Sequence, residues 1–449
     1  MKRLLSVLLW SIIAAAFLGP GTVTTAAAAG AGHGLALLWA LAFSTVATLV
    51  LQEASARLAI VSGHDLARAL RLRSHGALGA FVLLLVLGAV IVGCAAYEAG
   101  NILGGVAGLA LASALPGWAL VLAVGALAAA LLFLGNPRTV ARLLAAAVAV
   151  MGLAFLVTAA LLEPSVGGLL AGTLVPTFPP GSALLVLGLI GTTVVPYNLF
   201  LGSGVAAGQT LPELRFGLTV AVGLGGLISM AVLVVGSAVP GEFSFPALAA
   251  VLTARLGPWA ADLFAYGLAA AGVSSAVTAP LAAAITARGL FGGDGGEGAE
   301  AAEAAGPDRW SPRGWRYRAV WGGVLATGLL FGLTGVRPVP VILLAQALNG
   351  ILLPWVAVFL LLAVNDRRLM GRRGLNGPLS NTLMSAVVLV TLLLGTRNVL
   401  RAGASAVGLE APGEGLLLAV AGAVAVALAV PVARGVGRAR ATAPPAQSP

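Results

Sequence analysis

Long apolar runs alternate with short polar stretches along almost the whole chain. A helix that crosses a bilayer needs ~20 apolar residues, and most of the runs reach that length. The pattern predicts twelve spanning segments, near residues 6–30, 35–61, 78–104, 118–135, 140–162, 182–208, 216–239, 262–286, 318–335, 338–364, 379–396 and 415–433. We therefore expect an all-α polytopic membrane protein.

Two of these segments, the first and the sixth, are interrupted by a proline near their middle. The first contains Gly19–Thr22 (GPGT) and the sixth contains Val195–Asn198 (VPYN). Proline lacks a backbone N–H and clashes with the preceding turn, so each helix should unwind there. Unpaired backbone groups at bilayer depth are tolerated only where they line a protected cavity. Such paired breaks indicate the binding site of a secondary transporter.

The basic residues give the segments an orientation. If the N-terminus is inside, only four of the 25 lysines and arginines fall on the outer side, namely Arg255, Arg337, Arg397 and Arg401. Cytoplasmic loops carry most of the positive charge in membrane proteins. The distribution predicts a multi-pass protein of the cell inner (plasma) membrane with both termini in the cytoplasm.

The same count gives the first and sixth segments opposite directions. Two five-helix units that each open with a broken helix form an inverted repeat. We expect a transport core over residues 1–364, with repeat one at 6–162 and repeat two at 182–364. Two additional helices should follow within 365–433, then a disordered cytoplasmic tail at 434–449. The acidic stretch 292–307 is expected to be a flexible linker.

Composition narrows the class of function. The chain is 59% hydrophobic and 9% charged, whereas soluble domains carry about 25% charged residues. Its net charge of +10 comes from arginines between the apolar runs, which report topology, so we expect membrane lipid and not nucleic acid as its surroundings. No phosphate-binding loop, nucleophile–base pair or cofactor motif is found, so we expect neither an enzyme nor a cofactor.

Few charges lie inside the predicted segments. Glu98 is placed in the middle of the third, with Asn101 three residues on and on the same helix face. A carboxylate at that depth costs on the order of 3 kcal/mol and usually faces a cavity or a partner. We take Glu98 and Asn101 as a candidate proton or ion pathway. Glu53 is a further candidate, although Arg57 at i+4 favours a structural ion pair.

The breaks themselves offer backbone carbonyls, amides and half-helix dipoles. Thr22, Tyr197 and Asn198 add a hydroxyl, a phenol and an amide, and neither break contains a carboxylate. Gln346 in the tenth segment can hydrogen-bond to a neighbouring helix or face a substrate. These residues are the candidate lining of the site.

Several stretches resemble the Nramp family of divalent-metal transporters. They are Leu51–Leu58, Leu187–Ser203 (LGLIGTTVVPYNLFLGS), Leu263–Thr278 and Asn365–Gly371 (NDRRLMG). The resemblance covers most of residues 10–371. It implies a LeuT-like fold with segments 1–5 and 6–10 inverted, alternating access, and a divalent cation as the transported substrate with proton linkage. It also places Glu98 and Asn101 on the family's proton pathway, and Gln346 on a glutamine used in the occluded state.

The resemblance departs from the family at the breaks. Gly19, Thr22 and Val195 stand where the family has aspartate, asparagine and methionine, and Tyr197 and Gly202 replace two histidines. A thioether favours late transition metals, and valine offers no such ligand. We therefore expect a largely hydrated cation held by carbonyls, Thr22, Tyr197 and Asn198, with Thr22 and Asn198 as its side-chain ligands.

Two alternatives to a metal transporter remain open from the sequence. The first is a transporter of a small organic solute such as an amino acid, because a glycine-rich break with free amides suits a carboxylate. The second is a membrane receptor or scaffold that has lost transport, because the family's metal ligands are missing.

Overall fold

The computed structural model describes residues 6, 10, 19–74, 76–135, 138–206, 208–292, 309–372, 374–406 and 413–441, and these residues form helices without any strand. Ten helical segments among them are long and apolar enough to cross a membrane. The main helices are α2 (Pro20–His33), α3 (Leu38–Ser62), α5 (Gly76–Ala112), α6 (Gly117–Leu134), α7 (Arg138–Leu161), α9 (Ala183–Thr193), α10 (Pro196–Val205), α11 (Leu211–Gly236), α13 (Trp259–Phe291), α15 (Trp315–Leu333), α16 (Pro338–Ala363), α18 (Pro378–Ala406) and α19 (Glu414–Ala441).

These helices match the predicted segments closely. The ninth segment forms α15 but is not among the ten, since Arg316 and Arg318 make its first turn polar. The first segment is described from Gly19 onward, together with Ser6 and Trp10, both helical. Its residues 11–18, like most of the linker 292–307, lie outside the described residues.

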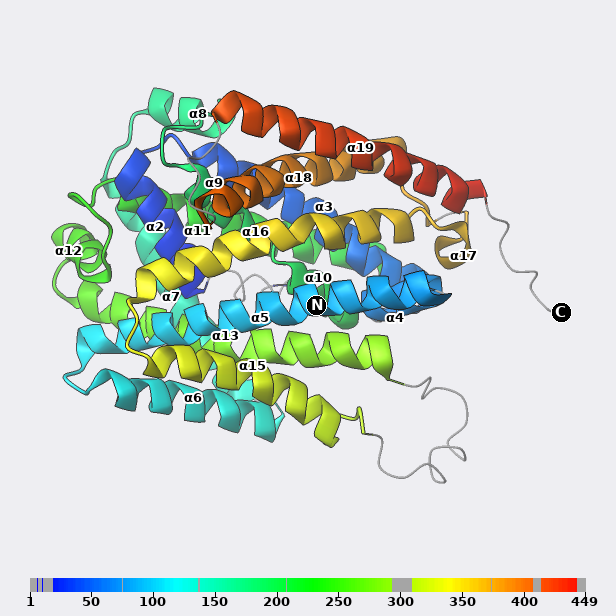
Figure 1. Cartoon of the computed structure of the whole chain (residues 1–449). Helices are drawn as coiled ribbons and strands as arrows, with labels where there is room; N and C mark the ends of the chain where they lie inside the picture. The colour runs from blue at the N-terminus through cyan, green and yellow to red at the C-terminus, as the bar shows by residue number, and fades with distance from the viewer. Residues whose placement is uncertain are drawn as a thin grey trace.

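Four short helices occupy predicted loops and cap the bundle. They are α4 (Leu66–Arg73), α8 (Val166–Leu174), α12 (Phe245–Leu256) and α17 (Arg367–Met370). α4 and α17 lie at one end of the long helices, and α8 and α12 lie at the other (Figure 1). The end with α4, α17 and the last turns of α19 carries most of the described arginines, and we call it the arginine-rich end.

Proline opens a helix at both breaks. α9 ends at Thr193, Val195 has an extended backbone, and Pro196 then starts α10. In the same way, Gly19 is extended and Pro20 starts α2. Proline is favoured at the first helical position, where its missing N–H has no intrahelical partner to lose. The break in the sixth segment is confirmed, and so is the start of the second half-helix in the first.

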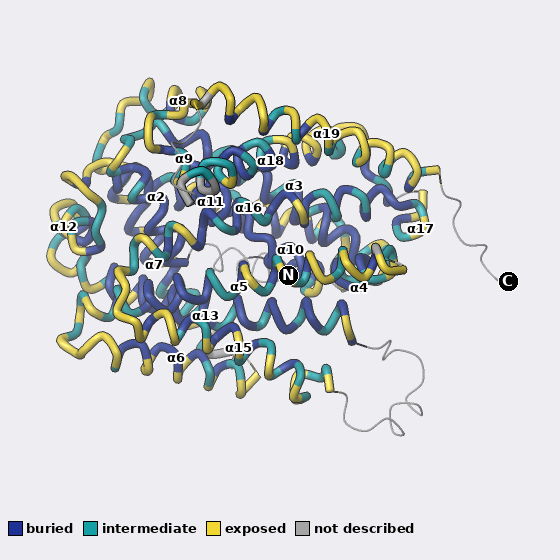
Figure 2. Tube along the Cα trace, in the orientation of Figure 1, coloured by how far each residue is buried: buried dark blue, intermediate teal, exposed yellow. Residues whose placement is uncertain are grey.

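Small residues allow the central helices to pack with their backbones close together. A Cβ added to Gly272 of α13 would lie only 2.4 Å from Gly105 Cα of α5. Likewise, a Cβ on Gly191 of α9 would lie 2.0 Å from the carbonyl oxygen of Gln346 in α16. α9 and α10 are almost entirely buried in this interior, whereas α19 is largely exposed at the edge (Figure 2). Close approach through glycine is a common way to join helices in lipid.

One predicted boundary is wrong. The tail was expected to be disordered from residue 434, but α19 continues through Ala441. Arg440 near its end donates to Asn365 Oδ1 at 2.8 Å and also to the carbonyl of Asn376. The arginines and glycines of 434–441 look like a solvated tail in the sequence, yet tertiary hydrogen bonds hold this segment in a helix.

Candidate functional site

The two breaks meet in the structure. Thr22, in the first turn of α2, and Thr192, in the last turn of α9, place their hydroxyl oxygens 2.8 Å apart. Both side chains are fully buried. The carbonyl of Gly19 accepts from the backbone N–H of Thr22 and of Val23, which fixes the turn at the start of α2. Residues far apart in the chain therefore form one polar centre in the interior.

Gln346 reaches the first break from α16. A Cβ at Gly21 would lie 2.1 Å from Gln346 Nε2, so glycine at this position makes room for the amide. The side chain is 1% exposed, and its Oε1 has no hydrogen-bond partner. The sequence placed Gln346 on the site lining, and the structure brings it against the break.

Tyr197 and Asn198 lie in the first turn of α10, and each is 1% exposed. Among the described residues, the hydroxyl of Tyr197 and both amide atoms of Asn198 have no hydrogen-bond partner. Most buried polar side-chain atoms are paired in folded proteins, and an unpaired one calls for water, an ion or a ligand. The start of α10 is thus a cluster of polar atoms without hydrogen-bond partners among the residues that the structure describes. Val195, just before it, contributes only an apolar wall.

Four polar residues around the breaks, Tyr97, Gln52, Thr192 and Thr193, were not among the predicted site residues. Tyr97 of α5 donates to the carbonyl of Thr192 at 3.1 Å, and its ring packs edge-on against that of Tyr197 with centroids 5.5 Å apart. Gln52 of α3 faces Gly202, where an added Cβ would lie 2.3 Å from Gln52 Oε1. Thr192 and Thr193 lie at the end of α9, directly before a proline break. This position was the one signal in the sequence that could have identified them as residues of the site.

Glu98 is fully buried on α5, next to Tyr97. Asn101 donates to Glu98 Oε2 at 3.4 Å, which confirms the predicted pairing on one helix face. Glu98 Oε1 has no partner, and Gly328 of α15 packs against the side chain, where an added Cβ would lie 2.7 Å from Glu98 Cγ. The carboxylate therefore lies between α5 and α15, and Tyr97 on the same helix connects this region to the breaks.

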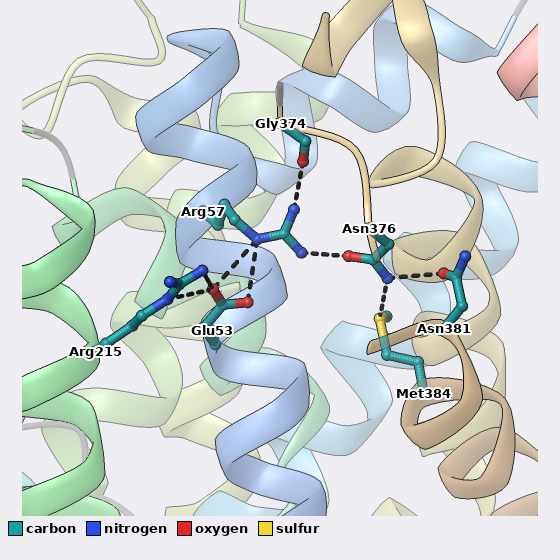
Figure 3. A network of polar contacts seen from close by, with 7 residues as sticks. All are labelled: Glu53, Arg57, Arg215, Gly374, Asn376, Asn381 and Met384. Carbon is teal, nitrogen blue, oxygen red and sulfur yellow. Dashed lines mark hydrogen bonds and ion pairs between the residues drawn. The ribbon is translucent and has the colours of Figure 1, made fainter. Parts of the chain in front are cut away.

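Glu53 has different surroundings. Its carboxylate lies 3.1 Å from Arg57 Nε, as predicted, and 2.9 Å from Arg215 Nη2 of α11 (Figure 3). Two other α3 residues bond to the sixth segment, namely Thr48 to the carbonyl of Thr193 and Ser55 to the carbonyl of Leu199. Glu53 is directed away from these contacts toward α11, so the structure does not bring it to the breaks.

Arg57 continues this network toward the loop after α17. It donates to the carbonyl of Gly374 at 2.5 Å and to Asn376 Oδ1, while Asn376 donates to Asn381 Oδ1 at 2.9 Å (Figure 3).

Arg73 and Asp366 form a second ion pair at the arginine-rich end, at 2.5 Å. Burial lowers the pKa of Arg73 from its ordinary value, and the charge of Asp366 opposes that shift. This end of the molecule is held together by paired charges.

The donor set at the breaks is neutral and rich in oxygen. No group of three or more His, Cys, Asp or Glu residues able to hold a metal occurs among the residues that the structure describes. The side-chain groups that could serve as ligands are the hydroxyl of Thr22, the amides of Asn198 and Gln346, and the phenol of Tyr197. Such hard oxygen ligands suit cations that keep part of their water shell.

The chain is similar to known metal transporters over most of its length. A family model described as natural resistance-associated macrophage protein-like matches residues 11–401. A protein of Verminephrobacter eiseniae named divalent metal cation transporter MntH is 32% identical over 301 residues, which is 62% of this chain and 67% of that protein. The Deinococcus radiodurans protein of the same name is 28% identical over 391 residues, 83% of this chain and 84% of its own length.

Solved structures show the same fold. A manganese transporter of Eremococcus coleocola, 18% identical, superposes with a TM-score of 0.69 over 97% of this chain and 94% of its own. Mhp1, a nucleobase-cation-symport-1 family transporter in a closed conformation, gives 0.52 at 16% identity, over 96% of this chain and 92% of its own. The predicted LeuT-like fold with inverted repeats is thereby confirmed. The chain belongs to the natural resistance-associated macrophage protein-like family, Nramp.

Proposed function

We propose that this protein is a secondary membrane transporter that carries a divalent metal cation between the two breaks by alternating access. The observation that carries the proposal is the buried cluster at the breaks, where polar atoms of Tyr197, Asn198 and Gln346 have no hydrogen-bond partner within the described part of the chain. An arriving cation with its water would satisfy them. The relatives named as divalent metal cation transporters support the class of substrate.

The proposed lining consists of Gly19, Thr22, Val195, Tyr197, Asn198 and Gln346. Thr22 and Asn198 would supply the side-chain oxygens that bind the metal or its inner waters. No carboxylate offsets the cost of stripping a dication of its water, so the ion should enter largely hydrated. Magnesium gives up its water reluctantly and suits such a site. Neither alternative from the sequence, an organic solute or a scaffold, gains a comparable observation.

Glu98 and Asn101 form the proposed proton path. Glu98 has one free carboxylate oxygen in a fully buried position, so it can take up and release a proton as its surroundings change. Glu53, tied to two arginines, would serve the ion path only indirectly, by holding α3 against α11 at the arginine-rich end.

The proposed location is the inner (plasma) membrane with both termini in the cytoplasm. Two features support it, namely the strong arginine bias of the sequence and the position of α4, α17 and the end of α19 at one end of the bundle (Figure 1). The exterior of the long helices is apolar, with exposed residues such as Leu84, Leu153 and Leu227, as lipid contact requires.

Uptake into liposomes that contain the purified full-length chain tests the proposal. We expect saturable uptake of a divalent cation, with magnesium competing against manganese, and no uptake in liposomes without protein. Flux of an amino acid in the absence of any divalent flux would overturn the choice of substrate. Absence of flux for every solute would favour the scaffold.

A further inference from the structure

Two adjoining cavities open between α3, α11 and α18 at the arginine-rich end. Their volumes are about 290 Å³ and about 500 Å³, and they share Arg57, Arg215 and Ser380 in their walls. They lie apart from the breaks, and none of the proposed transport residues lines them except Glu53.

The charges in these walls are mostly positive. Arg57 and Arg215 share one carboxylate, Glu53, and the larger cavity adds Arg372. Glu53 is the one acidic side chain among the described residues that line the two cavities. Three guanidinium groups against one carboxylate leave an excess of positive charge, which attracts an anion.

The arginines differ in how much hydrogen-bonding capacity remains. Arg57 is fully engaged by Glu53, Gly374 and Asn376 (Figure 3). Arg215 directs only its Nε and Nη2 to Glu53, and its side chain is 60% exposed. Arg372 is exposed as well. Arg215 and Arg372 can therefore turn toward a phosphate, which guanidinium groups bind through paired N–H donors.

Apart from the charged residues and the hydroxyls of Thr219 and Ser380, the wall of the smaller cavity is apolar. It is formed by Leu49, Val50, Ala54, Leu218, Leu383 and Met384. The combined cavity thus has a basic mouth and an apolar interior along membrane-spanning helices. A free phosphate ion would contact only the basic part of the cavity. A lipid would fill both parts, with its headgroup at the arginines and an acyl chain along the apolar wall.

We infer that this cavity binds an anionic glycerophospholipid. Its phosphate would lie between Arg215 and Arg372, near Ser380 in the first turn of α18, and an acyl chain would follow the apolar wall toward Met384. The partial positive charge at the start of α18 adds to the attraction for the phosphate. The lipid would bridge α3 and α11, in the transport core, to α18, which lies outside the repeats.

Thermal unfolding of the full-length protein in a neutral detergent tests this inference. Added phosphatidylglycerol should raise the unfolding temperature in a dose-dependent way, because a ligand that binds only the folded state stabilises it. Phosphatidylcholine and glycerol 3-phosphate should give no comparable rise. Equal stabilisation by phosphatidylcholine would overturn the specific site. Equal stabilisation by glycerol 3-phosphate would show a soluble phosphate ligand and overturn the lipid.

Variants locate the site. Arg215→Gln and Arg372→Gln should each reduce the lipid-induced rise in unfolding temperature by half or more. In Arg215→Gln, Glu53 still has Arg57 as its partner. Leu383→Trp, at a partly exposed position, should obstruct the apolar part and weaken lipid binding with all arginines in place. Arg337→Gln, at an exposed position beside α16, is the matched control and should keep the full shift. Wild-type shifts in all three test variants would overturn the inference.

Discussion

Asn198, in the broken sixth segment, and Asn376, at the arginine-rich end, are both buried asparagines with opposite surroundings. Neither amide atom of Asn198 has a partner. Asn376 accepts from Arg57 and donates to Asn381 and to the sulfur of Met384 (Figure 3). A paired polar network fixes the helices that it joins, whereas unpaired polar atoms are costly unless a ligand or water satisfies them. The hydrogen bonds at the arginine-rich end thus fix the positions of its helices, whereas the unpaired atoms at the breaks can bind a ligand.

The largest effect on stability is expected at the arginine-rich end. Arg57→Leu removes one of the two arginine partners of Glu53 and, at the same time, the donor to the Gly374 carbonyl and to Asn376 Oδ1. The Arg57 side chain is only 7% exposed. Arg215 still pairs with Glu53 in this variant, so the main cost comes from the buried acceptors left without a donor, about 1 to 3 kcal/mol for each. We expect a large fall in unfolding temperature and in folded yield. Arg337→Leu is the control, and equal stability of the two variants would contradict the assigned role of the network.

Asn198→Ala should show the opposite pattern. The amide has no partner to leave unpaired, so stability should change little, whereas removal of a ligand oxygen should lower kcat/KM for divalent uptake about tenfold or more, which is ~1.4 kcal/mol. Both uptake and unfolding are measured on the same preparation. Asn398→Ala is the matched control, because the Asn398 amide donates to the carbonyl of Leu394 within its own helix. If Asn198→Ala lowered the unfolding temperature while the folded protein transported normally, the Asn198 amide would be a structural residue and not a ligand.

Glu98→Gln tests the proton path with a smaller change. Glutamine keeps the size of the side chain and can still accept from Asn101, but it carries no exchangeable charge. We expect divalent uptake to persist while losing its response to an imposed pH gradient. The measurement is uptake at fixed external pH with internal pH varied. A response that matches wild type would remove Glu98 from the path.

The sequence was a good guide wherever a single residue type dictates local backbone. Pro20 and Pro196 predicted the breaks, and the long apolar runs predicted the membrane-spanning helices, because both signals are local in the sequence. The contact of Gln52 with Gly202 was not predictable, since it depends on how α3 packs against α10. The helix over 434–441 was missed for the same reason, as Arg440 finds its partners only in the folded protein.

Tyr97→Phe gives the smallest expected effect, and it tests whether the breaks and Glu98 are linked through α5. The substitution keeps the ring packed on Tyr197 but removes the hydrogen bond to the Thr192 carbonyl, worth about 1 kcal/mol. That carbonyl lies in the last turn of α9, so its release should loosen the break more than the fold. We expect a small loss of stability, a higher KM for the cation, and an unchanged response to the pH gradient. Tyr266→Phe, at an exposed position, should change none of these. An altered pH response in Tyr97→Phe would instead mean that the break and Glu98 act as one unit, because Tyr97 bonds to the break and is the neighbour of Glu98 on α5.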